Sequence, residues 1–406
     1  MSDVISKFSK LGVENAPGQE SLQAEEELPI IGDAIPGTPV DFSHGDVDAH
    51  KPIPGSLERF IYGYVNGGGH QAYTEYRGKG DIREYLAAKL AKFSGAPVDS
   101  ASEIILTPGT QGALFLAIGA MVGQGDKVAI IEPDYFANRK LVEFFDGELV
   151  NIPIHWCETK QYSGLDLAAL EKAFQDGVKV FLYSNPNNPT GVIYSPQEVA
   201  AIGRLAKKYN VAVIADELYS RQILSDDLTY THLRALPERP ETLVTIIGPS
   251  KTESLSGFRL GVAYGSSNII ARMEKLQAIV SLRAAGYCQT AFWGWFSEPK
   301  DWMKDRIQDH RTIRDDLLSV ISQYPGCWAR PTEGGSYLFM RLPELQVTLP
   351  QFVKICRSQA GVIVTPGTEF GHGLDNYVRL NFSQDHLAAV DAVGRLCQMA
   401  LRYQKK

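Results

Sequence analysis

The sequence contains few cysteines, and their spacing offers no framework for cross-links. Five occur among 406 residues, widely separated: Cys157, Cys288, Cys327, Cys356 and Cys397. No two have CxxC spacing, and the eight histidines form no HExxH pattern. These absences argue against a disulfide-stapled secreted domain, a cysteine zinc site and a metal hydrolase. They favour reduced thiols in a cytoplasmic protein.

The chain also lacks long apolar runs and an excess of basic charge. No stretch offers about twenty uninterrupted apolar residues, so we expect no membrane span. Residues 1–8 lack the basic and apolar regions of a signal peptide. The net charge is −7 and charges of both signs are scattered, which disfavours a nucleic-acid-binding surface. We therefore expect neither a membrane nor a nucleic acid as partner.

Apolar residues are plentiful enough for a large core. They make up 44% of the 406 positions, which favours two domains. Residues 1 to about 30 are polar and acidic, and predict either a mobile tail or an arm that packs on a neighbouring subunit. We expect an arm and a substrate loop over 1–54 as part of the small domain, a large domain over 55–300 and a small C-terminal domain over 301–406.

Apolar runs alternate with helical patterns through the first part of the chain. Five short runs predict strands: Ile104–Leu106, Lys127–Ile131, Val178–Tyr183, Val211–Ala215 and Leu243–Ile247. Helices are predicted over Gly78–Phe93 and Gln111–Val122. This alternation is typical of an α/β fold in which helices wind around a mostly parallel sheet.

A long helical stretch over about 267–323 is predicted to link this core to a smaller α+β domain. The expected strands there are 334–339, 362–364 and 377–381. The expected helices are Leu349–Ala360 and Asp385–Arg402.

Polar side chains follow several predicted strands, where an open α/β sheet binds its ligand. Asp216 comes directly after a buried strand, and Tyr219 lies three residues later. A buried carboxylate needs a partner, and the protonated nitrogen of a pyridine ring is a suitable one. A helix N-cap is the alternative for Asp216. Tyr219 either faces the same ligand or packs in the core.

Two further strands end in residues suited to ligand binding. The loop Asn185–Gly191 reads Asn-Pro-Asn-Asn-Pro-Thr-Gly, and its prolines fix φ, so Asn188 is expected in one orientation toward a ligand. A plain turn is the alternative. Gly248 and Pro249 end another strand, and Lys251 follows. Lys251 is expected in the ligand crevice, with an ordinary surface lysine as the alternative.

Three more positions fit an anionic, aromatic ligand. Gly109–Gly112 opens a predicted helix, whose N–H groups and dipole favour a phosphate, although such residues also cap ordinary helices. Tyr135 is expected to stack on a ring or to pack in the core. Arg379 interrupts an apolar strand, and its planar guanidinium matches a carboxylate. A structural ion pair is the alternative for Arg379.

Together these motifs resemble the fold-type I pyridoxal-phosphate enzymes, specifically the class I/II aminotransferases, from about residue 41 to 402. The most specific are the Asn185–Gly191 run and Ser250-Lys251 with Arg259 eight residues after the lysine. The resemblance implies a large domain with a mostly parallel seven-stranded sheet that binds pyridoxal 5′-phosphate. It also implies amino transfer between an α-amino acid and a 2-oxo acid.

The resemblance assigns roles to individual residues. Lys251 is implied as the Schiff-base lysine and proton shuttle, and Asp216 as the partner of the pyridine nitrogen. Asn188 and Tyr219 are implied to bond the phenolic oxygen, and Tyr135 to stack on the ring. The implied phosphate ligands are Gly109, Thr110, Gln111, Ser250 and Arg259.

Substrate and subunit contacts are implied in the same way. Arg379 matches the arginine that binds the α-carboxylate, and Gly45 is implied to contact that carboxylate. Tyr73 resembles a tyrosine that reaches the partner subunit's phosphate. Arg283 lies near where dicarboxylate-specific members place a second arginine from the partner, with a solvated helix arginine as the alternative. If Tyr73 and Arg283 act across a boundary, the active unit is a homodimer.

Several positions depart from the family pattern and leave the substrate open. Val47 and Ala49 replace the usual proline and phenylalanine, Glu253 and Ser256 are polar near the lysine, and Asn66–Gly69 is unusual. A lyase, decarboxylase or cyclising biosynthetic enzyme with the same cofactor stays an alternative. A non-catalytic sensor is disfavoured, because residues 1–40 are too short and too acidic for an appended DNA-binding domain.

Overall fold

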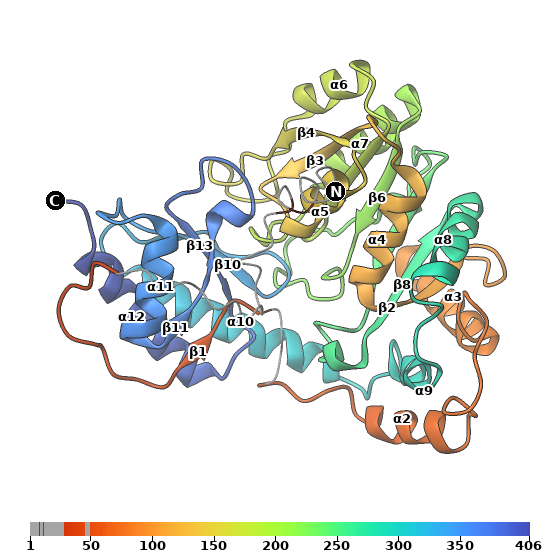
Figure 1. The fold of residues 1–406 in the computed structure, drawn as a ribbon, viewed down its shortest axis with the longest axis horizontal. Helices are drawn as coiled ribbons and strands as arrows, with labels where there is room; N and C mark the ends of the chain where they lie inside the picture. Colours follow the sequence, from red (N-terminus) through yellow and green to blue (C-terminus); the bar gives the residue numbers. More distant parts are fainter. Residues whose placement is uncertain (1–7, 9–10, 12–27, 45–48) are drawn as a thin grey trace.

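A computed structural model describes residues 8, 11, 28–44 and 49–406 of the chain. Figure 1 shows two neighbouring parts, with the C-terminal elements in blue on the left and the larger sheet on the right. The predicted Gly45 and Val47 positions lie outside the described residues.

The larger part is built on a seven-stranded sheet in the order β2-β8-β7-β6-β5-β3-β4. Its strands are β2 (Ile104–Pro108), β3 (Lys127–Glu132), β4 (Glu148–Pro153), β5 (Val180–Ser184), β6 (Ala212–Asp216), β7 (Leu243–Ile247) and β8 (Leu260–Gly265). Only β8 runs antiparallel to its neighbours. The predicted α/β fold with a mostly parallel seven-stranded sheet is confirmed.

Alternate residues of the central strands point to opposite faces of this sheet, as strand geometry requires. Phe181 and Tyr183 pack in one core with the helices α6 (Leu167–Gln175) and α7 (Pro196–Tyr209). Val180 and Leu182 pack in the other. The helices of that second face are α4 (Gly109–Met121), α5 (Phe136–Phe144) and α8 (Ser267–Val280). Both faces are therefore covered, which explains the nearly continuous apolar runs of β5 and β7.

The smaller part combines C-terminal elements with a segment near the N-terminus. A four-stranded sheet has the order β12-β13-β10-β9, and β1 pairs with β11 in parallel. The strands are β1 (Val40–Asp41), β9 (Trp328–Ala329), β10 (Tyr337–Arg341), β11 (Val362–Ile363), β12 (Thr365–Pro366) and β13 (Tyr377–Asn381). The helices α10 (Trp302–Ile321), α11 (Leu349–Ala360) and α12 (His386–Arg402) pack on them. The domain boundaries after residues 54 and 300 stay a prediction.

Two sequence-based expectations need correction. The single helical stretch over 267–323 is wrong in its middle, where only α9 (Gly286–Gln289) and a 3₁₀ turn (Thr290–Gly294) lie between α8 and α10. Leu282 and Phe296 have positive φ shortly after α8 and the 3₁₀ turn end, and Asp301 has positive φ just before α10 begins, so the chain is not helical at these positions. The strand expected at 362–364 is one residue too long, because β11 ends at Ile363, and β12, which begins at Thr365, belongs to a different sheet.

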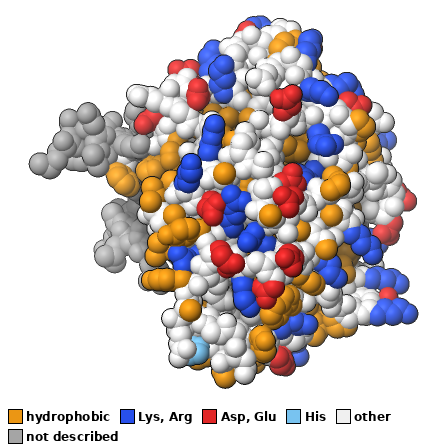
Figure 2. All heavy atoms as spheres, turned by 90° about the vertical axis from the view of Figure 1, so that its right-hand side faces the viewer, with side chains coloured by type: hydrophobic (Ala, Val, Ile, Leu, Met, Phe, Trp, Pro, Cys, Tyr) orange, Lys and Arg blue, Asp and Glu red, His pale blue; other side chains and the backbone are white. Residues whose placement is uncertain are grey.

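The remaining helices lie along the edge of the larger part. They are α2 (Ser56–Val65) and α3 (Gly80–Ser94), with short 3₁₀ turns at Leu233–Ala235, Ser256–Phe258 and Gly367–Glu369. Within the described ranges, no helix combines the length and the hydrophobicity that crossing a bilayer requires. On the face shown in Figure 2, basic and acidic side chains alternate with apolar ones.

Candidate active site

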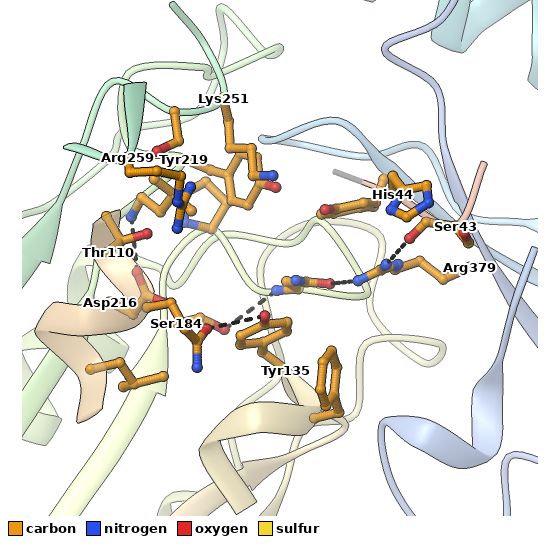
Figure 3. Close-up of a pocket in the computed structure, with 18 residues that line it drawn as sticks. Ser43, His44, Thr110, Tyr135, Ser184, Asp216, Tyr219, Lys251, Arg259 and Arg379 are labelled. Atoms are coloured by element: carbon orange, nitrogen blue, oxygen red, sulfur yellow. Dashed lines mark hydrogen bonds between the residues drawn. The ribbon is translucent and has the colours of Figure 1, made fainter. Parts of the chain in front are cut away.

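One cavity lies between the two parts, at the carboxyl ends of the parallel strands. Figure 3 shows side chains from both parts converging on it. The lining residues are Ser43, His44, Thr110, Gln111, Leu114, Tyr135, Phe136, Ser184, Pro186, Asn188, Asp216, Leu218, Tyr219, Ser250, Lys251, Arg259, Tyr337 and Arg379. The structure thus brings together residues up to 336 positions apart in the chain, as the contact between Ser43 and Arg379 shows.

Most of the predicted site residues face this cavity. They are Thr110, Gln111, Tyr135, Asn188, Asp216, Tyr219, Ser250, Lys251, Arg259 and Arg379. Gly109 lies beside them, because a Cβ there would collide with the Arg259 guanidinium. Tyr73 and Arg283 instead line a different cavity, and Tyr73 is 79% exposed. The cavity near Lys251 is therefore formed, within one chain, without these two residues.

Lys251 lies in a tight turn that follows the buried strand β7. Pro249 breaks the strand, and the turn closes through bonds from Leu255 N to the Pro249 carbonyl and from Ser254 N to the Lys251 carbonyl, each 3.1 Å. The Ser250 hydroxyl donates to the Leu260 carbonyl of β8 at 3.4 Å. These bonds hold the turn against the sheet, so the lysine side chain faces the cavity from a rigid support.

Asp216 ends β6, and its side chain is partly buried at the floor of the cavity. Its carboxylate accepts one backbone bond, from Leu218 N at 3.1 Å. Burial raises the pKa of this carboxyl to about 6, because the ionised form has lost its hydration. The strand is followed by a turn, so the predicted alternative of a helix N-cap does not describe this residue. A partly buried, weakly satisfied carboxylate is suited to a cationic ligand atom.

The N-terminus of α4 and the Arg259 guanidinium meet at one end of the cavity. Gly109 begins the helix with φ 77°, and Gly261 of β8 is so close that a Cβ on it would clash with the Gly109 backbone. Arg259 itself has φ 51° and donates to the Ser256 carbonyl at 2.9 Å. Helix N–H groups and a fixed cation together form a site for a dianion.

Arg379 occupies the opposite end, where it is buried to 3% exposure. Its guanidinium donates to Asn188 Oδ1 at 3.0 Å, to the Ser43 carbonyl at 2.8 Å and to the Thr365 hydroxyl at 3.4 Å. The rings of Tyr337 and Phe370 stack on it. Its partners among the described residues include no carboxylate, and its Nε has no partner. The structural ion pair is therefore disfavoured, and an anionic ligand is favoured.

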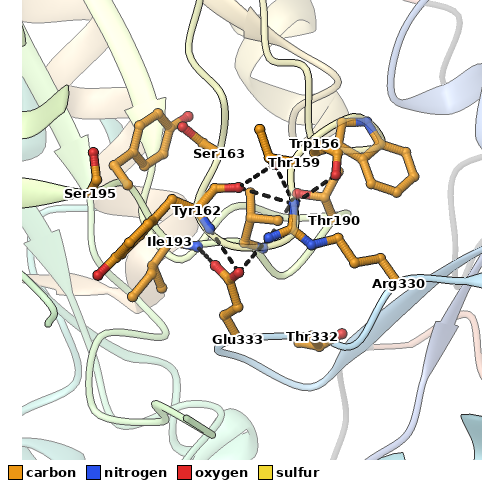
Figure 4. A network of polar contacts seen from close by, with 12 residues as sticks. Trp156, Thr159, Tyr162, Ser163, Thr190, Ile193, Ser195, Arg330, Thr332 and Glu333 are labelled. Carbon is orange, nitrogen blue, oxygen red and sulfur yellow. Dashed lines mark hydrogen bonds and ion pairs between the residues drawn. The ribbon is translucent and has the colours of Figure 1, made fainter. Parts of the chain in front are cut away.

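A buried ion pair supports the Asn188 loop from behind (Figure 4). Glu333 and Arg330 pair at less than 7% exposure, and Glu333 Oε2 accepts Ile193 N at 3.0 Å. Arg330 donates to the Trp156 and Tyr162 carbonyls. The two residues precede β10, so they tie the loop of the larger sheet to the smaller part.

A second ion-pair cluster joins the two turns that carry Tyr219 and Lys251. Arg221 lies 2.5 Å from Glu253 and 2.8 Å from Glu298, with all three side chains nearly buried. Burial, with Glu298 nearby, raises the pKa of Glu253 to about 7 despite Arg221. The sequence singled out Glu253 as unusual, but Arg221 was missed because its partner is 32 positions away.

Comparison with known proteins places this geometry among aminotransferases. A sequence model described as aminotransferase class I and II matches residues 40–393. An aspartate aminotransferase from Rhodobacter sphaeroides has a crystal structure that is 57% identical, covers 99% of this chain and 100% of its own, and superposes with a TM-score of 0.92. An aspartate aminotransferase of Sulfolobus acidocaldarius is 29% identical over 82% of this chain and 83% of its own length. A putative aminotransferase of Bacillus subtilis is 30% identical over 78% and 80%.

Proposed function

The chain belongs to the aminotransferase class I and II family and is an aminotransferase, and we propose that it uses pyridoxal 5′-phosphate to move the amino group of an acidic α-amino acid to a 2-oxo acid. The observation that carries this proposal is the cavity itself. Lys251 and Asp216 line the same cavity as a dianion site at Arg259 and, at its other end, a carboxylate site at Arg379. The related aspartate aminotransferases support the choice of donor.

The residues present fit this cofactor. Asp216 is a partly buried carboxylate whose pKa desolvation raises to about 6, so it is suited to a cationic partner. At the opposite edge, helix N–H groups and the Arg259 guanidinium suit a phosphate. Tyr135 and Gln111 line the space between, with the Tyr135 hydroxyl donating to Gln111 Oε1 at 3.2 Å. The chain therefore offers an acid partner, an anion site and an amine in one cavity.

When bound, pyridoxal phosphate supplies an electron sink that stabilises negative charge on the substrate Cα. Lys251 is the amine that attaches the cofactor, and after release it moves a proton at the Cα as general base and acid. Asp216 keeps the ring nitrogen protonated. Asn188 and Tyr219 are proposed to donate hydrogen bonds to the phenolic oxygen of the cofactor, and Arg379 to bind the α-carboxylate of the substrate.

Incubating the protein with aspartate and 2-oxoglutarate tests the proposal. We expect oxaloacetate and glutamate to form, and Arg379→Lys to raise KM for every amino donor, because a point charge cannot make the bidentate contact. The expected loss in kcat/KM is about 10²- to 10³-fold, from roughly 3–4 kcal/mol of lost charged hydrogen bonding.

Arg341→Lys is the matched control for this variant. Arg341 ends β10, which pairs directly with the Arg379 strand, yet Arg341 is exposed. Arg341→Lys should leave KM within about twofold of the parent's value, as surface substitutions usually do. Equal losses in both variants would show that the effect is structural, and absence of product from the parent protein would remove the proposed reaction.

We also place the active unit in a homodimer. Exposed apolar residues on α2 and at the end of α8 support this, including Leu57 at 63% exposure and Ile279 at 82%. The cavity that holds Tyr73 and Arg283 lies near the end of α8. A patch of this kind is typical of a subunit interface. Tyr73 would then reach the phosphate of the partner.

Mixing two inactive variants tests this arrangement. Tyr73→Ala should weaken cofactor binding, and Lys251→Ala should be inactive. If Tyr73 acts across the boundary, mixed dimers contain one intact site, and the mixture should regain about a quarter of the parent activity. Each variant alone, refolded in the same way, is the control. No regain, or a monomer in light scattering that turns over, would contradict the shared site.

A further inference from the structure

His44 is a basic residue of the cavity to which the proposed reaction gives no role. Figure 3 places it beside Ser43 and Arg379, at the end of the cavity away from Arg259 and Thr110. This is the end proposed to hold the substrate. His44 lies on the segment that follows β1, so it belongs to the smaller part, like Arg379.

The backbone that carries His44 is fixed directly to the Arg379 strand. Arg379 donates to the Ser43 carbonyl at 2.8 Å, and Asn381 Nδ2 donates to the His44 carbonyl. Asn381 and Arg379 lie on the same strand, β13. The position of the imidazole is therefore set relative to the guanidinium.

A carboxylate orients the ring itself. His44 Nε2 lies 3.2 Å from Asp41 Oδ2. The other oxygen of Asp41 accepts the Ser43 N–H at 2.8 Å and the Ser43 hydroxyl at 2.6 Å. Ser43 therefore fixes the orientation of the carboxylate that faces the imidazole. With Nε2 directed to Asp41, Nδ1 is the ring nitrogen that can serve a second partner.

The charge of the substrate requires such a partner. An acidic donor carries two carboxylates, and Arg379 satisfies the one on the α-carbon. Lys251 is proposed to attach the cofactor, and Arg259 to bind the phosphate of the cofactor. Among the described lining residues, His44 is the remaining basic side chain. A desolvated carboxylate without a donor would be bound poorly.

Arg283 is the competing candidate for the same task. In this chain its guanidinium stacks on the rings of Tyr73 and Tyr76, at 4.3 and 4.6 Å from their centres. It therefore has aromatic partners of its own, and it lines a cavity distinct from that of Lys251.

We propose that His44, oriented by Asp41, binds the side-chain carboxylate of the amino donor and so selects acidic over neutral substrates. This inference rests on the proposed function, because it assigns the second end of the same substrate. Its class of ligand is a four- or five-carbon dicarboxylate. Arg379 binds one end, and His44, with both ring nitrogens protonated, donates from Nε2 to Asp41 and from Nδ1 to the carboxylate at the other end.

The test compares donors in holoenzyme carrying His44→Leu or His44→Asn. His44→Leu should lower kcat/KM for aspartate about 10- to 100-fold, the value of a hydrogen bond to a charged group, while alanine changes less than about threefold. His44→Asn keeps an N–H near Nδ1 and should recover part of the loss. Inhibition by succinate should weaken in His44→Leu, and inhibition by propionate should not.

A histidine paired with an aspartate elsewhere provides the matched control. His386 on α12 lies 2.7 Å from Asp316, and His386→Leu should leave both donors unchanged. Equal losses for aspartate and alanine in His44→Leu, no change for either, or loss of the preference in Arg283→Ala alone would each overturn the proposal. If the parent protein turned over no donor, the proposed function itself would fail, which is a separate outcome.

Discussion

Lys251→Ala should lower amino transfer by at least about 10⁴-fold, the largest effect expected of any single substitution. The variant loses both the amine that attaches the cofactor and the group that moves the Cα proton, and proton transfer alone is worth roughly 10² to 10⁴. Single-turnover absorbance measures the loss in rate. In the same spectra the parent should show the visible band of a lysine-bound cofactor, and the variant should not.

Lys275→Ala is the control for that experiment. Lys275 is exposed on α8, away from the cavity. Its replacement should leave the visible band and turnover intact. If Lys251→Ala kept the parent's spectrum and rate, the assignment of the attachment site would be wrong, whatever the fold.

Asp216→Asn should lower kcat roughly 10²- to 10³-fold, because removing one partner of a buried ion pair costs about 3–5 kcal/mol. An amide cannot hold the ring nitrogen in its protonated form, so the electron sink is weakened. Asp216→Glu, which keeps the charge, should retain more activity than Asp216→Asn. The reverse order would contradict a charge-based role.

The same substitution, which is expected to lower kcat, should stabilise the cofactor-free protein at neutral pH. The folded-state pKa of Asp216 is raised to about 6 from 3.8, so its contribution to stability is present below the unfolded pKa and is lost as pH rises through 6. The amide that replaces the carboxyl does not titrate. The free energy of unfolding of cofactor-free Asp216→Asn, taken relative to that of the parent, should therefore be higher at pH 7 than at pH 4 by on the order of 2–3 kcal/mol. Urea unfolding at both pH values measures this, and a pH-independent difference would contradict it.

Periodicity located the buried strands well because both faces of the sheet are covered. β5, β6 and β7 are apolar except for Ser184, Asp216 and Thr245, and the predicted runs overlap each of them. β4 was missed because it is an edge strand whose residues are largely exposed. β8 was missed because glycines interrupt it, although Gly261 is needed where the strand approaches α4. Local pattern therefore predicts central strands better than edges.

The candidate site was predicted where motifs are local and missed where contacts are distant. The Asn185–Gly191 loop and the Ser250-Lys251 pair are contiguous, and their residues meet in the cavity. Arg221 and Arg330 act through partners that no local pattern names, and His44, although it pairs with Asp41 three positions earlier, is tied to the site by Asn381, 337 positions later. The Arg330 pair lies behind the Asn188 loop, and its contacts with Trp156 and Tyr162 span more than 160 positions.

The order in which the chain is synthesised has a consequence for this cavity. Lys251, Asp216 and Arg259 all precede the C-terminal elements of the smaller part, whereas Arg379 is made 191 positions after its partner Asn188. A ribosome-bound chain that has emerged through residue 300 carries the amine, the acid, the dianion site and His44, but it lacks the Arg379 guanidinium. Premature termination would therefore leave a fragment that keeps the residues proposed to hold the cofactor but lacks the arginine proposed to bind the α-carboxylate of every donor.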